Sequence, residues 1–141
     1  MASDLSGVHG IERQAQRSWH CAFTWPREGI ATADRTFDGL DHEYAFVIPK
    51  DYDPSRSYQV RFQLHGGIAR ARPPVVNRIR VDALPSGVEE ISVYPGGWVR
   101  SLWWSATQVD NLARILDRLK RTYNVDENRV YLTGTSDGGT G

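Results

Sequence analysis

The feature that most constrains this chain is the run Gly134-Thr135-Ser136-Asp137-Gly138, which directly follows the apolar segment 130–133. A G-x-S-x-G pattern after a short strand is typical of a nucleophile elbow. There a strand turns into a helix through one strained residue and exposes that residue's hydroxyl group. The flanking glycines allow strand and helix to approach closely. The N–H of Asp137 would then point to where an oxyanion forms.

The pattern is short, and with 13 glycines in 141 residues it can arise by chance. A glycine-rich turn or a phosphate-binding loop is the alternative interpretation of these five residues. The preceding chain favours the elbow, because it supplies a strand, a helix of suitable length and a second glycine-rich segment at His65-Gly66-Gly67.

The segment before the serine predicts a helix that begins at Ala106. Ser105 and Gln108 form a capping-box pattern, and Asn124 is expected just past the end of the helix. Apolar residues recur at spacings of three and four: Val109, Leu112, Ala113, Leu116 and Leu119. Residues 125–129 are then a link into the serine strand. The strands before and after the helix are therefore expected to be parallel, with a right-handed crossover.

Alternating apolar residues predict further strands upstream. The clearest segments are 43–49, 58–64 and 90–94, and residues 51–55 are a predicted turn. Weaker patterns indicate a strand over 19–25 and a short helix over 76–84. They also indicate a hairpin-like passage, in which residues 36–37 lead through a turn at 38–39 into the 43–49 strand.

Composition excludes several classes of function. With 17 basic and 17 acidic residues, no overall field attracts the chain to nucleic acid or to an anionic membrane. The single cysteine, Cys21, rules out an internal disulfide and mildly favours a reducing compartment. The sequence shows no signal peptide and no transmembrane run, so a cytoplasmic location is expected. No His/Cys/Asp cluster has metal-ligand spacing, and neither a metal nor a cofactor is expected.

Residues 112–139 carry the pattern helix–Tyr-Asn-Val-Asp-x-x-Arg-Val-Tyr-Leu-Thr-Gly-x-Ser-x-Gly-Gly. This pattern resembles the serine-esterase branch of the α/β-hydrolase superfamily, and is similar to feruloyl esterases, polyhydroxybutyrate depolymerases and phospholipase/carboxylesterase-like proteins. The resemblance covers residues 35–141 and leaves residues 1–34 as an N-terminal arm or extra strand. It implies an α/β fold, a three-layer α/β-hydrolase sheet truncated after the nucleophile elbow. That sheet is mostly parallel, with antiparallel N-terminal strands and an order beginning 1-2-4-3-5.

The resemblance also implies roles for individual residues. Ser136 is the expected nucleophile, and the expected oxyanion hole uses the backbone N–H of Asp137 with that of Gly67 or Ile68. The implied reaction is hydrolysis of a small-molecule carboxylic ester through an acyl-enzyme. The tryptophans that precede the predicted helix either wall a substrate pocket or cover the core: Trp98, Trp103 and Trp104.

One departure from the family pattern is large. The family order is Ser, then Asp or Glu, then His, but the sequence ends five residues after Ser136 and all four histidines precede it. His65 is expected to be the structural start of the oxyanion loop. Asp137 is expected to point elsewhere and is not assigned as the triad acid. The sequence therefore predicts the N-terminal half of a hydrolase, nearly inactive alone. A non-catalytic binding or assembly protein with this fold is the alternative, and the oligomeric state is left open.

Overall fold

The computed structural model describes residues 28–32, 39–40, 42–71 and 87–141. The sequence-based assignments at 19–25 and 76–84, the first part of the hairpin-like passage and most of the N-terminal arm lie outside these residues. The described elements, in chain order, are β1 (Glu28–Thr32), β2 (Glu43–Val47), β3 (Tyr58–Leu64), β4 (Glu90–Pro95), α2 (Ala106–Thr122), β5 (Val125–Gly134) and α3 (Asp137–Thr140).

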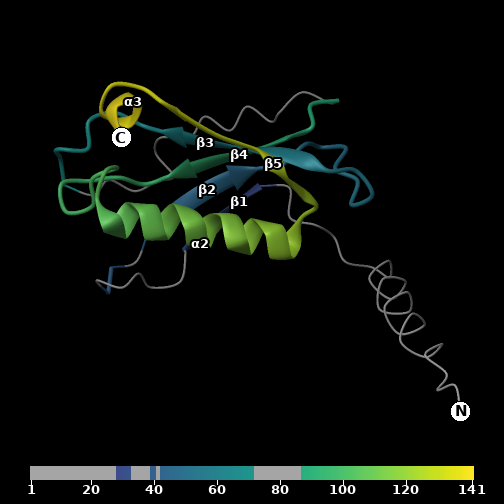
Figure 1. Cartoon of the computed structure of the whole chain (residues 1–141), viewed down its shortest axis with the longest axis horizontal. Coiled ribbons are helices and arrows are strands. Elements are labelled where there is room, and N and C mark those ends of the chain that lie inside the picture. Colours follow the sequence, from purple (N-terminus) through teal and green to yellow (C-terminus); the bar gives the residue numbers. More distant parts are fainter. Residues whose placement is uncertain (1–27, 33–38, 41, 72–86) are drawn as a thin grey trace, which may run out of the picture.

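The strands form one mixed sheet in the order β1-β2-β4-β3-β5 (Figure 1). β2 is antiparallel to both β1 and β4, whereas β3 is parallel to both β4 and β5. The predicted order and the antiparallel N-terminal strands are confirmed, but the described sheet is mixed, with two antiparallel and two parallel pairs, and a mostly parallel sheet stays a prediction. An extra strand within residues 1–34 was one of the two expected alternatives, but the position of β1 was not predicted, because its Glu-Gly-Ile-Ala-Thr segment has no strong alternation and carries a glycine.

The last strand is longer than predicted. Residues 125–129 are not a separate link, because Val125 already pairs with Tyr58. The register then shifts, so that Val130 lies opposite Val60. An ion pair of 2.7 Å between Asp126 and Arg129 lies within the extra residues. After this irregularity β3 and β5 run in register to their common end, Leu64 opposite Gly134. The chain segments that follow the two strands therefore start side by side.

The helix α2 begins where the capping pattern predicts. Ser105 is the N-cap, and its hydroxyl oxygen accepts a hydrogen bond from the N–H of Gln108. The end is also as predicted, since Tyr123 is the C-cap and has extended backbone, and Asn124 is therefore the residue just past the helix end. The N–H of Asn124 donates to the Tyr52 hydroxyl at 2.9 Å.

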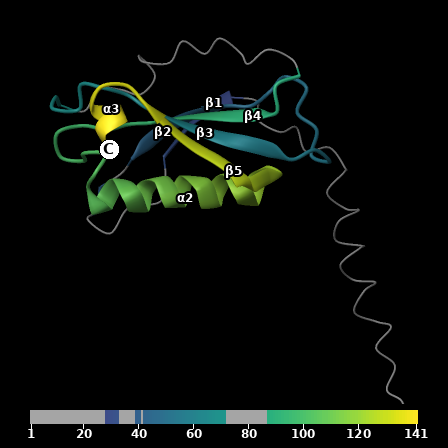
Figure 2. The ribbon, with the colours of Figure 1, turned by 45° about the horizontal axis from the view of Figure 1, so that its top comes forward.

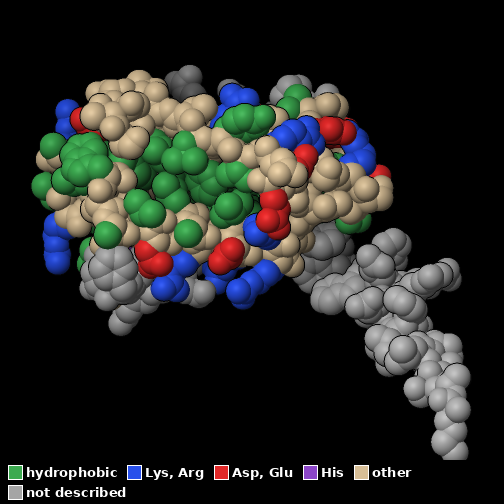
Figure 3. All heavy atoms as spheres, viewed as in Figure 1, with side chains coloured by type: hydrophobic (Ala, Val, Ile, Leu, Met, Phe, Trp, Pro, Cys, Tyr) green, Lys and Arg blue, Asp and Glu red, His purple; other side chains and the backbone are tan. Residues whose placement is uncertain are grey.

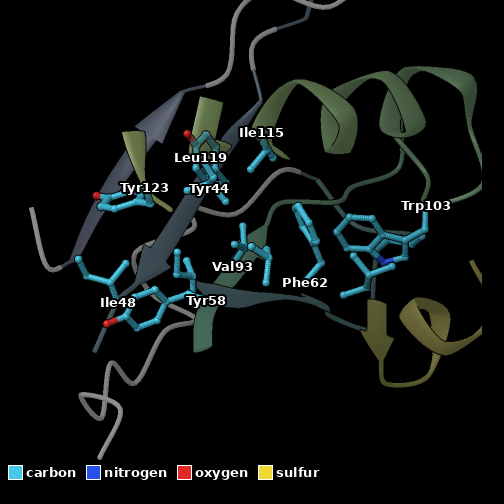
Figure 4. Close-up of a cluster of buried hydrophobic side chains, with 13 residues drawn as sticks. Tyr44, Ile48, Tyr58, Phe62, Val93, Trp103, Ile115, Leu119 and Tyr123 are labelled. Carbon is cyan, nitrogen blue, oxygen red and sulfur yellow. The ribbon is translucent and has the colours of Figure 1, made fainter. Parts of the chain in front are cut away.

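The core lies between α2 and one face of the sheet (Figures 2 and 4). Alternate residues of β3 point into it, with Val60 and Phe62 almost fully buried, and α2 contributes Ile115 and Leu119. Burying a side chain of this size stabilises a fold by roughly 1.5–3 kcal/mol. Among the described residues, α2 is the one helix that covers a face of the sheet. The structure thus shows a partial α/β fold, and the third layer stays a prediction. Neither described helix has the length and apolarity needed to cross a lipid bilayer.

Candidate active site

Ser136 stands in a strained turn between β5 and α3. Its backbone has φ 55° and ψ −120°. It is the one non-glycine residue in the described part of the chain with a positive φ. A residue held in such a conformation costs on the order of 1–3 kcal/mol and persists where its surroundings fix it. The residue is exposed to solvent at the carboxyl end of the sheet.

Two glycines permit the tight turn. A Cβ atom on Gly134 would overlap the backbone of Gly138, and a Cβ atom on Gly138 would overlap the carbonyl group of Leu64. The turn is also hydrogen-bonded, since the N–H of Thr135 donates to Leu64 O at 3.1 Å. The close approach of β3, β5 and α3 thus depends on the absence of side chains at these two positions.

The loop after β3 passes directly beside the serine. An ideal Cβ atom on Gly66 would lie 2.9 Å from the Cβ and 3.5 Å from the Oγ of Ser136. We call residues 65–70 the HGG loop. The HGG loop lies close to Ser136 because β3 and β5 end side by side. Backbone groups of the loop therefore lie beside the Ser136 hydroxyl group.

The carboxylate of Asp137 binds the HGG loop. Its Oδ2 accepts hydrogen bonds from the N–H of Gly67 at 2.7 Å and of Ile68 at 3.1 Å. The side chain of Asp137 therefore points to the HGG loop, a partner that the sequence analysis did not predict. These two N–H groups are the ones expected to bind an oxyanion, and here they bind a carboxylate oxygen. No sequence pattern signals this contact, because it joins residues about 70 positions apart.

His65 holds the HGG loop to the segment after β4. Its Nε2 accepts a hydrogen bond from the N–H of Gly97 at 3.0 Å, so its Nδ1 carries the proton and donates to Gly66 O at 2.9 Å. The ring packs edge-on against Trp103, with centroids 5.1 Å apart. Both ring nitrogens serve backbone groups, which is the structural use expected of this histidine.

The three tryptophans do not form one wall. Trp98 is 6% exposed and packs on the ring of His42. Trp103 is 3% exposed and donates from Nε1 to His65 O at 2.8 Å, so it braces the HGG loop at the end of the core nearest α3 (Figure 4). Trp104 is 55% exposed. Trp103 also borders an apolar cavity of about 300 Å³ between α2, β3 and β5, which Leu132 lines from the other side.

No group of three or more His, Cys, Asp or Glu side chains within the described ranges could hold a metal ion. Beside Ser136 the described residues supply a hydroxyl group, backbone N–H donors and one carboxylate.

No protein-family model and no curated protein matches the chain. Solved structures do match. A thermostable esterase is 26% identical with a TM-score of 0.57, over 81% of this chain and 36% of that protein. A putative dipeptidyl aminopeptidase IV from Bacteroides ovatus is 23% identical with a TM-score of 0.60, over 85% of this chain and 19% of that protein. A ferulic acid esterase from Anaeromyces mucronatus, in complex with ferulic acid, is 16% identical with a TM-score of 0.58, over 84% and 52%.

The chain therefore spans between about a fifth and about half of the length of these proteins. Esterases and peptidases of the α/β-hydrolase fold are its structural neighbours, and both groups are hydrolases. At these levels of identity, the structural similarity is evidence for the fold. The described part of this chain has a partial α/β-hydrolase fold.

Proposed function

We propose that Ser136 is the nucleophile of a serine hydrolase that acts on small-molecule carboxylic esters. The observation that carries this proposal is the strained, exposed Ser136 with the HGG loop packed beside it. The sheet places this serine at the carboxyl end of parallel strands, where α/β folds bind their ligands. The esterases among the structural neighbours favour an ester over a peptide.

The proposed reaction has two stages. The Oγ of Ser136 attacks the ester carbonyl, the bond to the alcohol breaks, and water then hydrolyses the acyl-enzyme. The N–H of Asp137 and one N–H of the HGG loop, at Gly67 or Ile68, stabilise the oxyanion of each stage.

A serine hydroxyl also needs a general base, which takes the proton of the hydroxyl group during the attack and gives it to the leaving alcohol. His65 is engaged with backbone groups, which leaves it poorly placed for that role. We propose that a histidine and its partner carboxylate come from a segment outside this chain. The greater length of the neighbouring esterases supports this view.

The test uses the full-length protein and a p-nitrophenyl ester. Ser136→Ala removes the nucleophile, and we expect kcat to fall by about 1,000-fold or more. Ser57→Ala is the matched control, an exposed serine at the opposite end of β3, and it should leave kcat unchanged. An Ser136→Ala protein that keeps more than a tenth of the wild-type kcat would contradict the assignment. If the wild-type protein is folded but shows neither turnover nor acylation, the result would support the alternative of a non-catalytic binding or assembly protein.

A further inference from the structure

We infer that Asp137 is a positioning residue, whose carboxylate ties the HGG loop to the turn at Ser136 and sets the place of the oxyanion donors. The inference rests on the proposed function. It concerns a side chain that the reaction itself does not require, since the expected role of Asp137 uses only its backbone N–H.

The geometry of the tie is specific. One oxygen, Oδ2 of Asp137, receives both N–H groups at 2.7 and 3.1 Å. Hydrogen bonds to a carboxylate are roughly twice as strong as bonds between neutral groups. Gly67, at the first of these bonds, has φ 71°, a conformation that side-chain-bearing residues rarely adopt. The carboxylate therefore holds the HGG loop at a turn whose backbone conformation favours glycine.

Other segments fix the two ends of the HGG loop. At the start, His65 is bonded to Gly97 and Trp103. At the end, Arg70 O accepts from the N–H of Val99 at 3.1 Å. The backbone N–H groups in the middle meet Asp137, which is adjacent in sequence to Ser136. Asp137 therefore fixes the position of the middle of the loop relative to Ser136, and no distant part of the fold is involved in this contact.

The tie has a consequence for the reaction. Two N–H groups bind the carboxylate before reaction, and when an oxyanion forms one of them turns to it while the other keeps the loop in place. Because the oxyanion is absent from the bound ester and forms only in the transition state and the tetrahedral intermediate, loss of the tie should lower kcat and leave KM nearly unchanged.

The experiment compares Asp137→Ala, Asp137→Asn and Asp51→Ala in the full-length protein, with a p-nitrophenyl ester as substrate. Asp51 is a matched control, because its carboxylate also accepts a glycine N–H, that of Gly87 at 3.1 Å, on the side of the sheet where β3 and β4 begin. We expect Asp137→Ala to lower kcat about 10- to 100-fold, less than the loss of a whole oxyanion donor. KM should change less than about two-fold. Asp137→Asn should recover part of kcat, since its amide oxygen still accepts hydrogen bonds. Asp51→Ala should leave both constants unchanged.

Amide hydrogen exchange provides a second readout that does not depend on turnover. Exchange in a peptide covering residues 64–71 should become faster in Asp137→Ala and stay unchanged in Asp51→Ala. If Asp137→Ala does not fold, the same measurements on Asp137→Asn decide the question.

Three outcomes would overturn the inference. The first is an unchanged kcat and unchanged exchange. The second is a higher kcat, which would mean that the carboxylate blocks the donors. The third is a higher KM with unchanged kcat, which would mean direct contact with substrate. The proposed function is contradicted by a different result, namely that Ser136→Ala keeps its activity. In that case the hydrogen-exchange experiment still tests whether Asp137 holds the HGG loop.

Discussion

At the scale of single residues, the turn at Ser136 depends on the absence of side chains at the neighbouring glycines. The backbone at Ser136 is strained, and Gly134 and Gly138 let β3, β5 and α3 approach around it. A strained backbone persists when its surroundings leave it no alternative. The two glycines are therefore as much a part of the turn as the serine.

We predict that Gly138→Val impairs both stability and activity. Its Cβ atom would overlap the carbonyl group of Leu64, and relief requires β3 or α3 to move. The expected loss of stability is on the order of 1–3 kcal/mol, measured by thermal or urea unfolding. Gly139→Ala is the control, because its Cβ atom would lie 3.3 Å from Gly134 O and needs only a small adjustment. Unchanged melting and unchanged turnover in Gly138→Val would show that the turn is not sterically closed.

The sequence predicted which residues form this turn but not what the side chain of Asp137 contacts. Glycine spacing is a local pattern, and a local pattern determines a local backbone shape. The bonds from Gly67 and Ile68 to Asp137 arise only when two strand ends meet in the sheet. A contact of that kind has no signature in the order of the residues.

At the scale of elements, the best predictions were those with a strong repeating pattern. Strands β2, β3 and β4 and the start of α2 lie where alternation and capping predict them. The start of β5 was predicted wrongly, because tertiary contacts decide it. Tyr58, far along the chain, pairs with Val125, and Tyr52 binds the preceding Asn124.

The end of α2 should respond to alkaline pH through Tyr123. Burial raises the pKa of Tyr123 to about 12 from its usual value of 10.0, with smaller contributions from Tyr52 and Tyr44. The unfolded chain thus loses this proton first as the pH rises. The stabilising contribution is complete below pH 10 and is lost progressively between about pH 10 and 12.

We therefore predict that Tyr123→Phe flattens the alkaline loss of stability. The phenylalanine ring keeps the packing against Tyr52 and Phe46 but cannot ionise. Melting temperatures measured from pH 8 to pH 11.5 should fall less steeply in this variant than in the wild-type chain. Burial also raises the pKa of Tyr52, so a residual slope is expected. Tyr131→Phe, at an exposed position, is the control and should keep the wild-type slope. Equal slopes in all three proteins would contradict the prediction.

At the scale of the whole molecule, β5 is the edge of the described sheet and its outer side has a large apolar area. Leu132 is 59% exposed and Val109 is 61% exposed, on opposite sides of the cavity between β5 and α2. Figure 3 shows hydrophobic side chains gathered over this region. The register pairs Leu132 with Phe62 on the core side and Tyr131 with Arg61 on the other side. Tyr131 is itself 47% exposed, so both faces of β5 carry exposed apolar side chains, and the apolar area beside the cavity is centred on Leu132.

An exposed strand edge beside an apolar cavity is a template for association with another chain. We predict that the purified 141-residue chain self-associates, and that Leu132→Lys reduces this association because it places a charge on the edge strand. Val99→Lys is the control. It removes an apolar residue that is 53% exposed but lies in the segment after β4, so it should not change the association. Light scattering at several concentrations measures the association, and near-UV circular dichroism reports whether the tryptophans are in a fixed environment. A monodisperse wild-type monomer with sharp tryptophan bands and cooperative melting would mean that the edge of β5 is protected, and the argument from the exposed edge would then be wrong.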